Sequence, residues 1–303
     1  MTIHEAQQQL LFQLYHIYDD REAQTITDWV MEHITEWKKI DRIINKKVPL
    51  SAAQQSALQD ITAQLLAHKP VHYVLHQAWF HGMKFYVDEN VLIPRPETEE
   101  LVEWVVKECL ETGYEDSSGV RSGSEAVKLS NNRISILDVG TGSGCIAIAL
   151  KKNIPQADVF ACDVSAEALL VAARNSEELQ KPVKLFQIDF LNAQERATLP
   201  VFDVIVSNPP YIALREKSQI DRHVLEYEPH TALFVPDEDS LVFYEHLAMF
   251  GRTHLKQGGF MMMEIHYLQG EAVKKLFESH GYSVIVEKDL QGNDRMVKVL
   301  LNA

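Results

Sequence analysis

The four consecutive residues Asn208-Pro209-Pro210-Tyr211 carry the most informative chemistry of this chain. They directly follow the apolar run 202–206, which predicts a buried parallel strand, and open α/β sheets bind ligands at such strand ends. The two prolines lack N–H donors and fix the backbone, which leaves rigid carbonyl acceptors. Asn208 adds a side-chain acceptor and Tyr211 a flat ring with a polar tip. Such a set can accept both hydrogens of a planar NH₂ group and stack on its face, but Asn-Pro is also a common turn signal.

A glycine-rich loop forms a second candidate site. Gly140-Thr141-Gly142-Ser143-Gly144 lies between a predicted strand at 134–139 and a predicted helix at 146–150. Glycines allow a backbone to approach a ligand closely, and a helix N-terminus offers free N–H groups. The spacing departs from the dinucleotide fingerprint because the third glycine comes one residue early, and no Gly-Lys-Ser/Thr follows as in a P-loop. A tight strand–helix turn without a ligand is the alternative interpretation.

Acidic residues also end the next two predicted strands. Asp163 offers a carboxylate suited to a ribose diol, or a helix N-cap. Asp189-Phe190 follows the strand after that. Because the carboxyl ends of parallel strands meet at one edge of a sheet, these positions and Asn208 predict a single cleft. The candidate cofactor-binding residues are therefore Gly140, Thr141, Gly142, Ser143, Gly144, Asp163, Asp189, Phe190 and Asn208.

The elements that position these residues form an alternating pattern. Apolar runs typical of buried strands occur at 134–139, 159–162, 183–188, 202–206 and 260–265. Helical runs lie between most of them, which predicts a parallel sheet covered on both faces. The last two runs, 282–286 and 296–301, flank turn residues and predict an antiparallel hairpin. The fold class is therefore α/β, with a mostly parallel seven-stranded sheet that ends in an antiparallel hairpin.

The first part of the chain has a different pattern. Up to about residue 72 the apolar residues repeat only at helical spacing, which predicts a small all-helical domain over 1–76. Short β-rich runs at 78–80, 84–87 and 91–93 predict a linking β-hairpin within 77–96. The α/β domain then occupies 97–303.

Two local features refine this division. Ser51 and Gln54 match a capping box and predict the start of a helix. The Ser/Gly-rich stretch 113–133 has no periodicity and predicts a flexible surface insertion.

Composition places the chain among soluble globular proteins of a reducing compartment. It has 303 residues, of which 46% are hydrophobic and 24% charged. The sequence has no apolar run of membrane-spanning length and no signal peptide, so we expect a cytoplasmic protein without a membrane partner. Three cysteines form no CxxC pair and are expected to be buried thiols, and no His/Cys/Asp spacing predicts a metal site.

The formal net charge of −14 argues against nucleic-acid binding. Nucleic-acid binders gain much of their affinity from Lys and Arg side chains that neutralise phosphates. One basic group, formed by Lys38, Lys39, Arg42, Lys46 and Lys47, is expected to share a helix. Ordinary solvated helix charge explains it more simply than a docking surface.

The ordered motifs resemble class I S-adenosylmethionine-dependent methyltransferases, in which an acidic residue ends the strand after a G-x-G-x-G loop. Asn-Pro-Pro-Tyr after the fourth strand is similar to members that methylate NH₂ nitrogens. The closest resemblance is to the release-factor glutamine N5-methyltransferases of the HemK/PrmC type. It extends to three further segments: Phe80-His81-Gly82-Met83-Lys84-Phe85, Leu92-Ile93-Pro94-Arg95-Pro96-Glu97-Thr98-Glu99 and Glu228-Pro229-His230-Thr231-Ala232-Leu233. His76 and Ser240 stand where the family usually carries glycine.

The resemblance implies a Rossmann-like class I methyltransferase fold, S-adenosyl-L-methionine as cofactor and peptide chain release factors as the substrate; we expect a monomer. Its substrate atom would be the side-chain nitrogen of the glutamine in their Gly-Gly-Gln motif, docked with help from the helical domain. By the same resemblance, the Asn208 side-chain carbonyl and the Pro209 main-chain carbonyl accept the two amide hydrogens. Tyr211 stacks on the amide plane and Pro210 keeps the loop rigid. Phe190 takes the place of an aromatic residue that packs on the adenine.

Two other functions fit parts of the sequence. A nucleic-acid amino-methyltransferase acting on adenine N6, cytosine N4 or guanine N2 would use the same acceptors, but the acidic charge and the lack of a basic recognition domain weigh against it. A non-catalytic S-adenosylmethionine-binding scaffold would have no use for an intact Asn-Pro-Pro-Tyr clamp.

Overall fold

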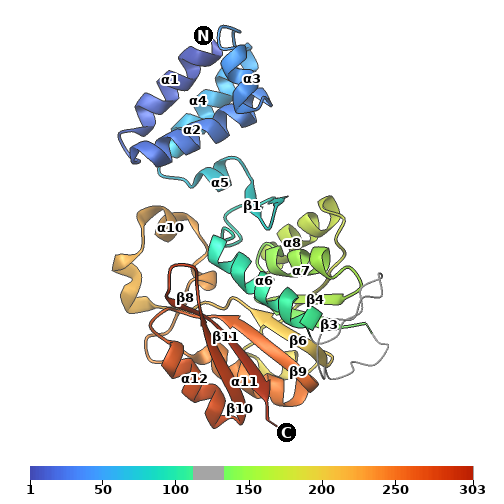
Figure 1. Ribbon diagram of the computed structural model, residues 1–303. Helices are drawn as coiled ribbons and strands as arrows, with labels where there is room; N and C mark the ends of the chain where they lie inside the picture. Colours follow the sequence, from blue (N-terminus) through green and yellow to red (C-terminus); the bar gives the residue numbers. More distant parts are fainter. Residues whose placement is uncertain (112–132, 303) are drawn as a thin grey trace. The chain divides into compact units, whose positions relative to one another are not determined.

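The computed structural model describes residues 1–111 and 133–302, which form two compact units (Figure 1). Unit 1 comprises Met1–Gln77 together with Ile220–Tyr227, and unit 2 comprises Ala78–Gln219 together with Glu228–Ala303. Apart from Arg133, the insertion predicted at 113–133 lies outside the described residues.

Unit 1 is helical. Its helices are α1 (Ile3–Leu14), α2 (Asp20–Thr35), α3 (Lys39–Ile44), α4 (Ala52–Leu66), α5 (Val71–Val74) and α10 (Arg222–Tyr227). Leu10, Val30 and Leu65 are among the buried residues that join α1, α2 and α4 in one core. The capping box predicted at Ser51 is confirmed, since Ser51 and Gln54 exchange side-chain-to-backbone hydrogen bonds at the start of α4.

The basic group predicted to share a helix in unit 1 does not do so. Helix α3 contains only Lys39 and Arg42 of that group. Arg42 is 3% exposed, and its guanidinium donates to Asp28 over 2.9 Å. Lys39 also donates to Asp28, and Lys38 donates to Glu32. Three of the five cations are thus matched by carboxylates, which leaves no continuous basic stripe.

Unit 2 is built on a seven-stranded sheet with the order β10-β11-β9-β6-β3-β4-β5. The strands are β3 (Ser135–Val139), β4 (Asp158–Asp163), β5 (Lys184–Gln187), β6 (Phe202–Ser207), β9 (Leu255–Glu264), β10 (Tyr282–Lys288) and β11 (Asp294–Leu301). Five neighbouring strands, from β9 to β5, are parallel, whereas β11 pairs antiparallel with both β9 and β10. The predicted mostly parallel sheet with an antiparallel C-terminal hairpin is confirmed.

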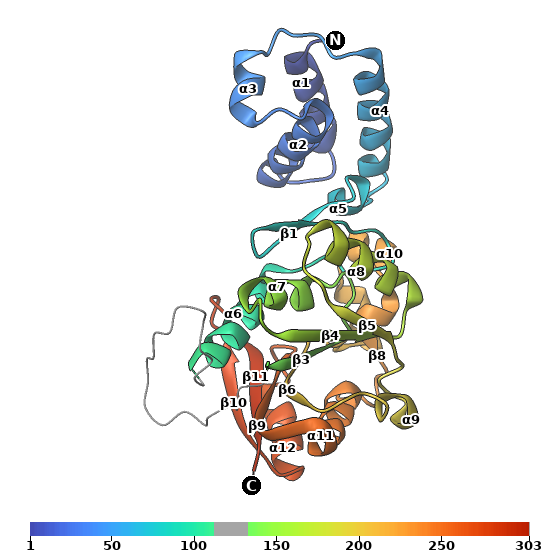
Figure 2. The same ribbon diagram turned by 90° about the vertical axis from the view of Figure 1, so that its right-hand side faces the viewer.

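Helices cover both faces of this sheet (Figures 1 and 2). One buried cluster joins α6 (Pro96–Glu111) and α7 (Cys145–Asn153) to strand residues such as Ile136 and Met262. The other joins α11 (Val242–His254) and α12 (Gly270–Ser279) to the alternate positions Leu137 and Met263. Because successive side chains of a strand point to opposite faces, a continuous apolar strand supplies both cores.

Shorter elements complete unit 2. They are β1 (Ala78–Phe80), β2 (Met83–Phe85), α8 (Ala166–Glu178), α9 (Ala193–Arg196), β7 (Ile212–Ala213), η1 (Leu214–Gln219), η2 (His230–Ala232) and β8 (Phe234–Val235). β1 and β2 form the predicted antiparallel hairpin. Among the described residues no helix has the length and apolar character that a membrane span requires.

Two details near the hairpin differ from the sequence patterns. The strand predicted at 91–93 is wrong, because the Ile93 N–H donates to the Glu228 side chain (3.2 Å) rather than to a strand. His76 has a φ of 51°, in the left-handed region that glycine adopts at little cost. A glycine at position 76 would relieve this strain.

Candidate active site

The candidate residues gather at one edge of the sheet. Strands β6, β3, β4 and β5 are parallel neighbours, so their carboxyl ends lie side by side. These ends lead to Asn208, Gly140, Asp163 and Asp189 in that order. The chain leaves β3 toward β4 on one side, while β6 pairs on the other side, so this edge contains a topological switch point. Open α/β sheets form ligand crevices at such a point.

The glycine loop is anchored to the neighbouring strand by main-chain hydrogen bonds. The N–H groups of Gly140 and Thr141 both donate to the Cys162 carbonyl at the end of β4, over 2.9 and 3.1 Å. Gly140, Gly142 and Gly144 have φ values of 72°, 54° and 81°. Since L side chains are strained at such angles, the loop requires glycine at each alternate position.

The three glycines differ in what surrounds them. A Cβ at Gly144 would lie 3.0 Å from Ile148 Cδ1 and 3.2 Å from Ala172 Cβ, so this glycine serves close packing of the loop on α7 and α8. A Cβ at Gly140 or Gly142 would meet no heavy atom within 4 Å. Two bare backbone positions therefore border open space at the strand ends, as close approach of a ligand requires. This feature fits an S-adenosylmethionine cradle.

The buried carboxyl group of Asp138 stabilises the glycine loop. Asp138 is fully buried, and its Oδ2 accepts hydrogen bonds from Thr141 Oγ1 (2.6 Å) and the Ala147 N–H (3.2 Å). Burial raises the pKa of Asp138 to about 7, although both hydrogen bonds act in the opposite direction. The carbonyl of Ser143, itself buried, accepts from the Asn175 side chain (2.9 Å). The loop is thus held at both ends by buried polar groups.

Asp163 connects the loop to the start of α8. Its Oδ2 accepts from the Gly142 N–H (2.9 Å) and its Oδ1 from the Ser165 N–H (3.0 Å). Ser165, rather than Asp163, is the N-cap residue of α8. Burial raises the pKa of Asp163, while these backbone donors act to lower it. A carboxylate has about four lone-pair sites, so both oxygens can still accept ribose hydroxyls.

Asp189 and Phe190 follow β5 and lie in different surroundings. Asp189 Oδ1 accepts from the Leu191 N–H (3.0 Å), which shapes the turn into α9. Phe190 is 5% exposed and packs edge-on against Phe250 of α11, with ring centroids 5.1 Å apart. Its ring belongs to the core that α11 and α12 form with the sheet.

The tetrapeptide after β6 is tied to two residues from distant parts of the chain. Asn208 Nδ2 donates to Thr98 Oγ1 (3.1 Å), and Thr98 Oγ1 donates to Glu264 Oε2 (2.7 Å). The Tyr211 hydroxyl donates to Glu264 Oε1 (3.1 Å). Pro209 is buried and Pro210 half-buried. One carboxylate therefore connects the first and last residues of the tetrapeptide.

Glu264 lies near a predicted strand end, but no catalytic role was predicted for it from the sequence. It ends β9, and the pairing of Ser207 with Met263 in the β6–β9 ladder places it beside Asn208. Burial raises its pKa, whereas the hydrogen bonds from Thr98 and Tyr211 and the charge of Arg295 act to lower it. The feature that could have identified Glu264 from the sequence is its position at a strand end, which also identified Asn208 and Asp163.

A second buried carboxylate fixes the segment before α6. Glu228 is 3% exposed and accepts from the Arg95 guanidinium (2.6 Å) as well as from the Ile93 N–H. The segments around Arg95 and Glu228, both of which resemble the methyltransferase family in sequence, are thus in contact within unit 2. Their pairing holds the backbone that leads to Thr98.

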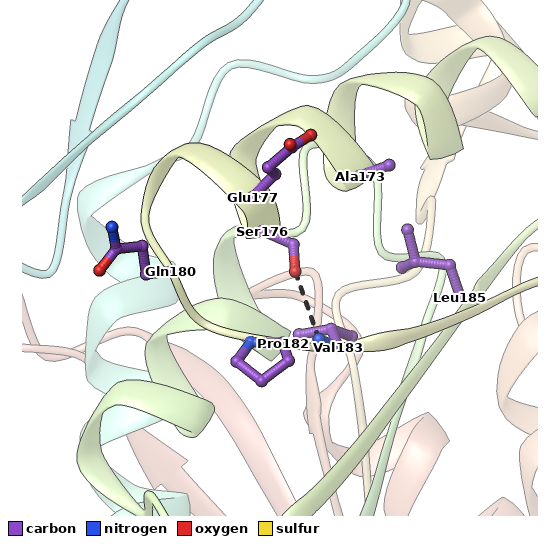
Figure 3. Close-up of a pocket in the computed structure, with 7 residues that line it drawn as sticks. All are labelled: Ala173, Ser176, Glu177, Gln180, Pro182, Val183 and Leu185. Carbon is purple, nitrogen blue, oxygen red and sulfur yellow. Dashed lines mark hydrogen bonds between the residues drawn. The ribbon is translucent and has the colours of Figure 1, made fainter.

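A separate hollow between α8 and β5 does not involve the candidate residues (Figure 3). Ser176, Glu177, Pro182, Val183 and Leu185 are among its lining residues, and Val183 N–H donates to Ser176 Oγ across it (3.3 Å). It adjoins the start of β5, whereas the candidate residues follow the carboxyl ends of the strands. It is therefore not the cleft of the glycine loop.

Known proteins share both this fold and the sequence that builds it. The family described as PrmC N-terminal domain matches residues 5–75, and the family described as Methyltransferase small domain matches residues 123–230. Among solved structures, the hMettl16 catalytic domain in complex with MAT2A 3′UTR hairpin 6 aligns with a TM-score of 0.51. It is 13% identical and the alignment covers 82% of this chain and 81% of that one, a likeness of fold.

Much closer relatives are similar over almost the entire chain. The release factor glutamine methyltransferase of Flavobacterium psychrophilum is 38% identical, over 99% of both chains. Proteins of the same name from Bacteroides thetaiotaomicron and Streptococcus pneumoniae are 39% and 43% identical, over 94% and 81% of this chain and 95% and 80% of theirs. With this identity over both units, the chain belongs to the release factor glutamine methyltransferase family.

Proposed function

We propose that this enzyme transfers the methyl group of S-adenosylmethionine to the side-chain nitrogen N5 of the glutamine in the Gly-Gly-Gln motif of peptide chain release factors. Family membership supports the reaction and the methyl donor. The observation that carries the assignment of the site is the hydrogen bonding of the Asn208 side-chain amide. Its Nδ2 is bonded to Thr98, whereas its Oδ1 accepts no hydrogen bond from any described residue. A free, rigidly held acceptor is what an incoming NH₂ group requires.

The cofactor residues divide by position along the strand ends. Gly140 and Gly142 would offer bare backbone to the ligand, with Thr141, Ser143 and Gly144 shaping the loop. Asp163 would bind the ribose hydroxyls, and Asp189 with Phe190 would border the adenine. When bound, S-adenosylmethionine supplies a methyl group already activated on a sulfonium cation. The protein is left with binding, orientation and electrostatics.

A glutamine amide is a poor nucleophile because its nitrogen lone pair is delocalised into the carbonyl. In this proposal the Asn208 Oδ1 and the Pro209 carbonyl accept its two hydrogens. As positive charge develops on the nitrogen, these acceptors bind the transition state better than the ground state. Tyr211 stacks on the amide plane, and Pro210 stiffens the loop. Asn208 takes no proton itself, because a carboxamide is not basic near neutral pH, so the proton leaves to water.

We also propose a division of labour along the chain. Residues 1–76 dock the release factor, 77–96 link, and 97–303 perform the transfer. A partner in translation implies a cytoplasmic enzyme, and we expect it to work as a monomer. No direct nucleic-acid contact is expected, in keeping with the net charge of −14 and the carboxylate-paired cations of unit 1.

The experiment is an incubation of the full chain with methyl-labelled S-adenosylmethionine and, separately, a release factor, the same factor with its Gly-Gly-Gln glutamine replaced by alanine, and DNA or RNA. Label on the intact factor alone, located on that glutamine by mass spectrometry, is expected. Label on nucleic acid would indicate an amino-methyltransferase of bases. Binding of the cofactor without transfer to any substrate would indicate a scaffold.

A further inference from the structure

The orientation of the Asn208 amide is decided by residues outside the tetrapeptide. The two ends of a carboxamide are nearly identical in shape, so only hydrogen-bond partners determine which end faces the cleft. Asn208 has one such partner among the described residues, the Thr98 hydroxyl, 3.1 Å from Nδ2. The chemistry of Thr98 therefore determines what Asn208 presents to a substrate.

Thr98 has a single hydrogen to donate. Its hydroxyl lies 2.7 Å from Glu264 Oε2, and both residues are 2% exposed. The Thr98 hydroxyl donates this hydrogen to Glu264 Oε2, because the Tyr211 hydroxyl donates to Oε1 and both oxygens of Glu264 therefore act as acceptors. The Thr98 oxygen can then only accept from Asn208, which directs the NH₂ end of the amide inward and Oδ1 outward. Tyr211 occupies the other oxygen of Glu264 (3.1 Å), so the carboxylate is held from both sides.

We propose that Thr98 is a positioning residue whose hydroxyl, oriented by Glu264, keeps the oxygen of the Asn208 amide toward the substrate. This inference rests on the proposed function, because it assumes that Asn208 Oδ1 accepts a hydrogen of the substrate NH₂ group. With the amide reversed, Asn208 would present its own NH₂ hydrogens to those of the substrate. The hydrogen bonds from Asn208 to Thr98 and from Thr98 to Glu264 thus make Asn208 an acceptor, rather than a donor, toward the substrate NH₂ group.

The test replaces Thr98 by valine, which has nearly the same shape but no hydroxyl. In T98V nothing selects the orientation of the amide, so kcat with a release factor should fall about 10- to 100-fold, the effect of one misplaced buried hydrogen bond. The KM for S-adenosylmethionine should stay within about twofold. Thr98→Ser keeps the hydroxyl and should recover most of the lost turnover. Unchanged kcat in T98V, or a T98S as slow as T98V, would overturn the proposal.

Two comparisons separate positioning from a general loss of packing. Ser176→Ala removes a hydroxyl from another helix, α8, where it donates to the Lys181 carbonyl (2.7 Å) beside the separate hollow, and should leave kcat unchanged. In an Asn208→Ala background, T98V should cause no further loss, because Thr98 acts through Asn208. A T98V defect that persists without Asn208 would contradict the proposal and assign Thr98 a purely structural role.

A readout without turnover keeps this inference separate from the proposed function. In wild-type protein, the Asn208 side-chain NH₂ hydrogens, assigned in NMR spectra by their absence in Asn208→Ala, should exchange slowly with water. In T98V that protection should fall at least about tenfold, as expected for a lost buried hydrogen bond. Equal protection in both proteins would overturn the proposal. If the wild type failed to methylate release factors, this measurement would still decide the role of Thr98.

Discussion

Alanine at Gly144 should mainly destabilise the fold, whereas alanine at Gly142 should mainly weaken cofactor binding. At Gly144 a Cβ would lie 3.0 Å from Ile148 Cδ1 and 3.2 Å from Ala172 Cβ, at a φ of 81°. The left-handed conformation costs about 1–2 kcal/mol and overpacking about 1–3 kcal/mol, so Gly144→Ala should destabilise the fold by roughly 2–5 kcal/mol. At Gly142 a Cβ meets no atom within 4 Å, which leaves only the conformational cost of about 1–2 kcal/mol.

The open space beside Gly142 leads to a second prediction, which concerns the affinity for the cofactor. If S-adenosylmethionine lies against that backbone, the added methyl group should weaken its binding by roughly tenfold or more, about 1.4 kcal/mol. Denaturant unfolding and calorimetric titration of both variants check the two effects. Gly142→Ala that binds the cofactor as tightly as the wild type would refute the placement of the ligand. Gly144→Ala as stable as Gly142→Ala would refute the packing argument.

Three further predictions concern titratable groups. Asp163→Ala should weaken S-adenosylmethionine binding in calorimetry, and unchanged affinity would remove Asp163 from the site. Burial raises the pKa of Cys109 and Cys145 to about 12 and that of Cys162 further, so none should be alkylated at pH 8 until the protein is unfolded, as mass spectrometry can verify. The pKa of Asp138 is raised from 3.8 to about 7, so its contribution to stability is present at low pH and is lost as the pH rises through about 7. Asp138→Asn should therefore gain stability relative to the wild type between pH 4 and 8, by up to about 4 kcal/mol in denaturant unfolding; a difference independent of pH would contradict this.

The sequence predicted those parts of the site that consist of a few consecutive residues after one strand. The sheet followed from continuous apolar runs, because only strands covered on both faces bury every residue, as β6 does. The glycine loop and the tetrapeptide each occupy a few consecutive residues, so their types and order were visible in the sequence. Their gathering at one edge then followed from the parallel arrangement.

Contacts between distant segments could not be predicted in the same way. Thr98 and Glu264 are 166 positions apart, and no local pattern connects them. The strand expected at 91–93 failed for a similar reason, since the Ile93 backbone is satisfied by Glu228 from far along the chain. Three cations of the basic group, Lys38, Lys39 and Arg42, form ion pairs with Asp28 or Glu32 of the neighbouring helix α2, and the charge pattern alone did not reveal this pairing.

The central claim is that Asn208 accepts a hydrogen of the glutamine amide during methyl transfer. Its most direct test compares kcat for a release factor between the wild type, Asn208→Ala and the exposed control Asn90→Ala. The account predicts a loss of about 100- to 1000-fold for Asn208→Ala with unchanged thermal stability, and wild-type turnover for Asn90→Ala. Methylation of the Gly-Gly-Gln glutamine by Asn208→Ala at a near-normal rate would contradict it.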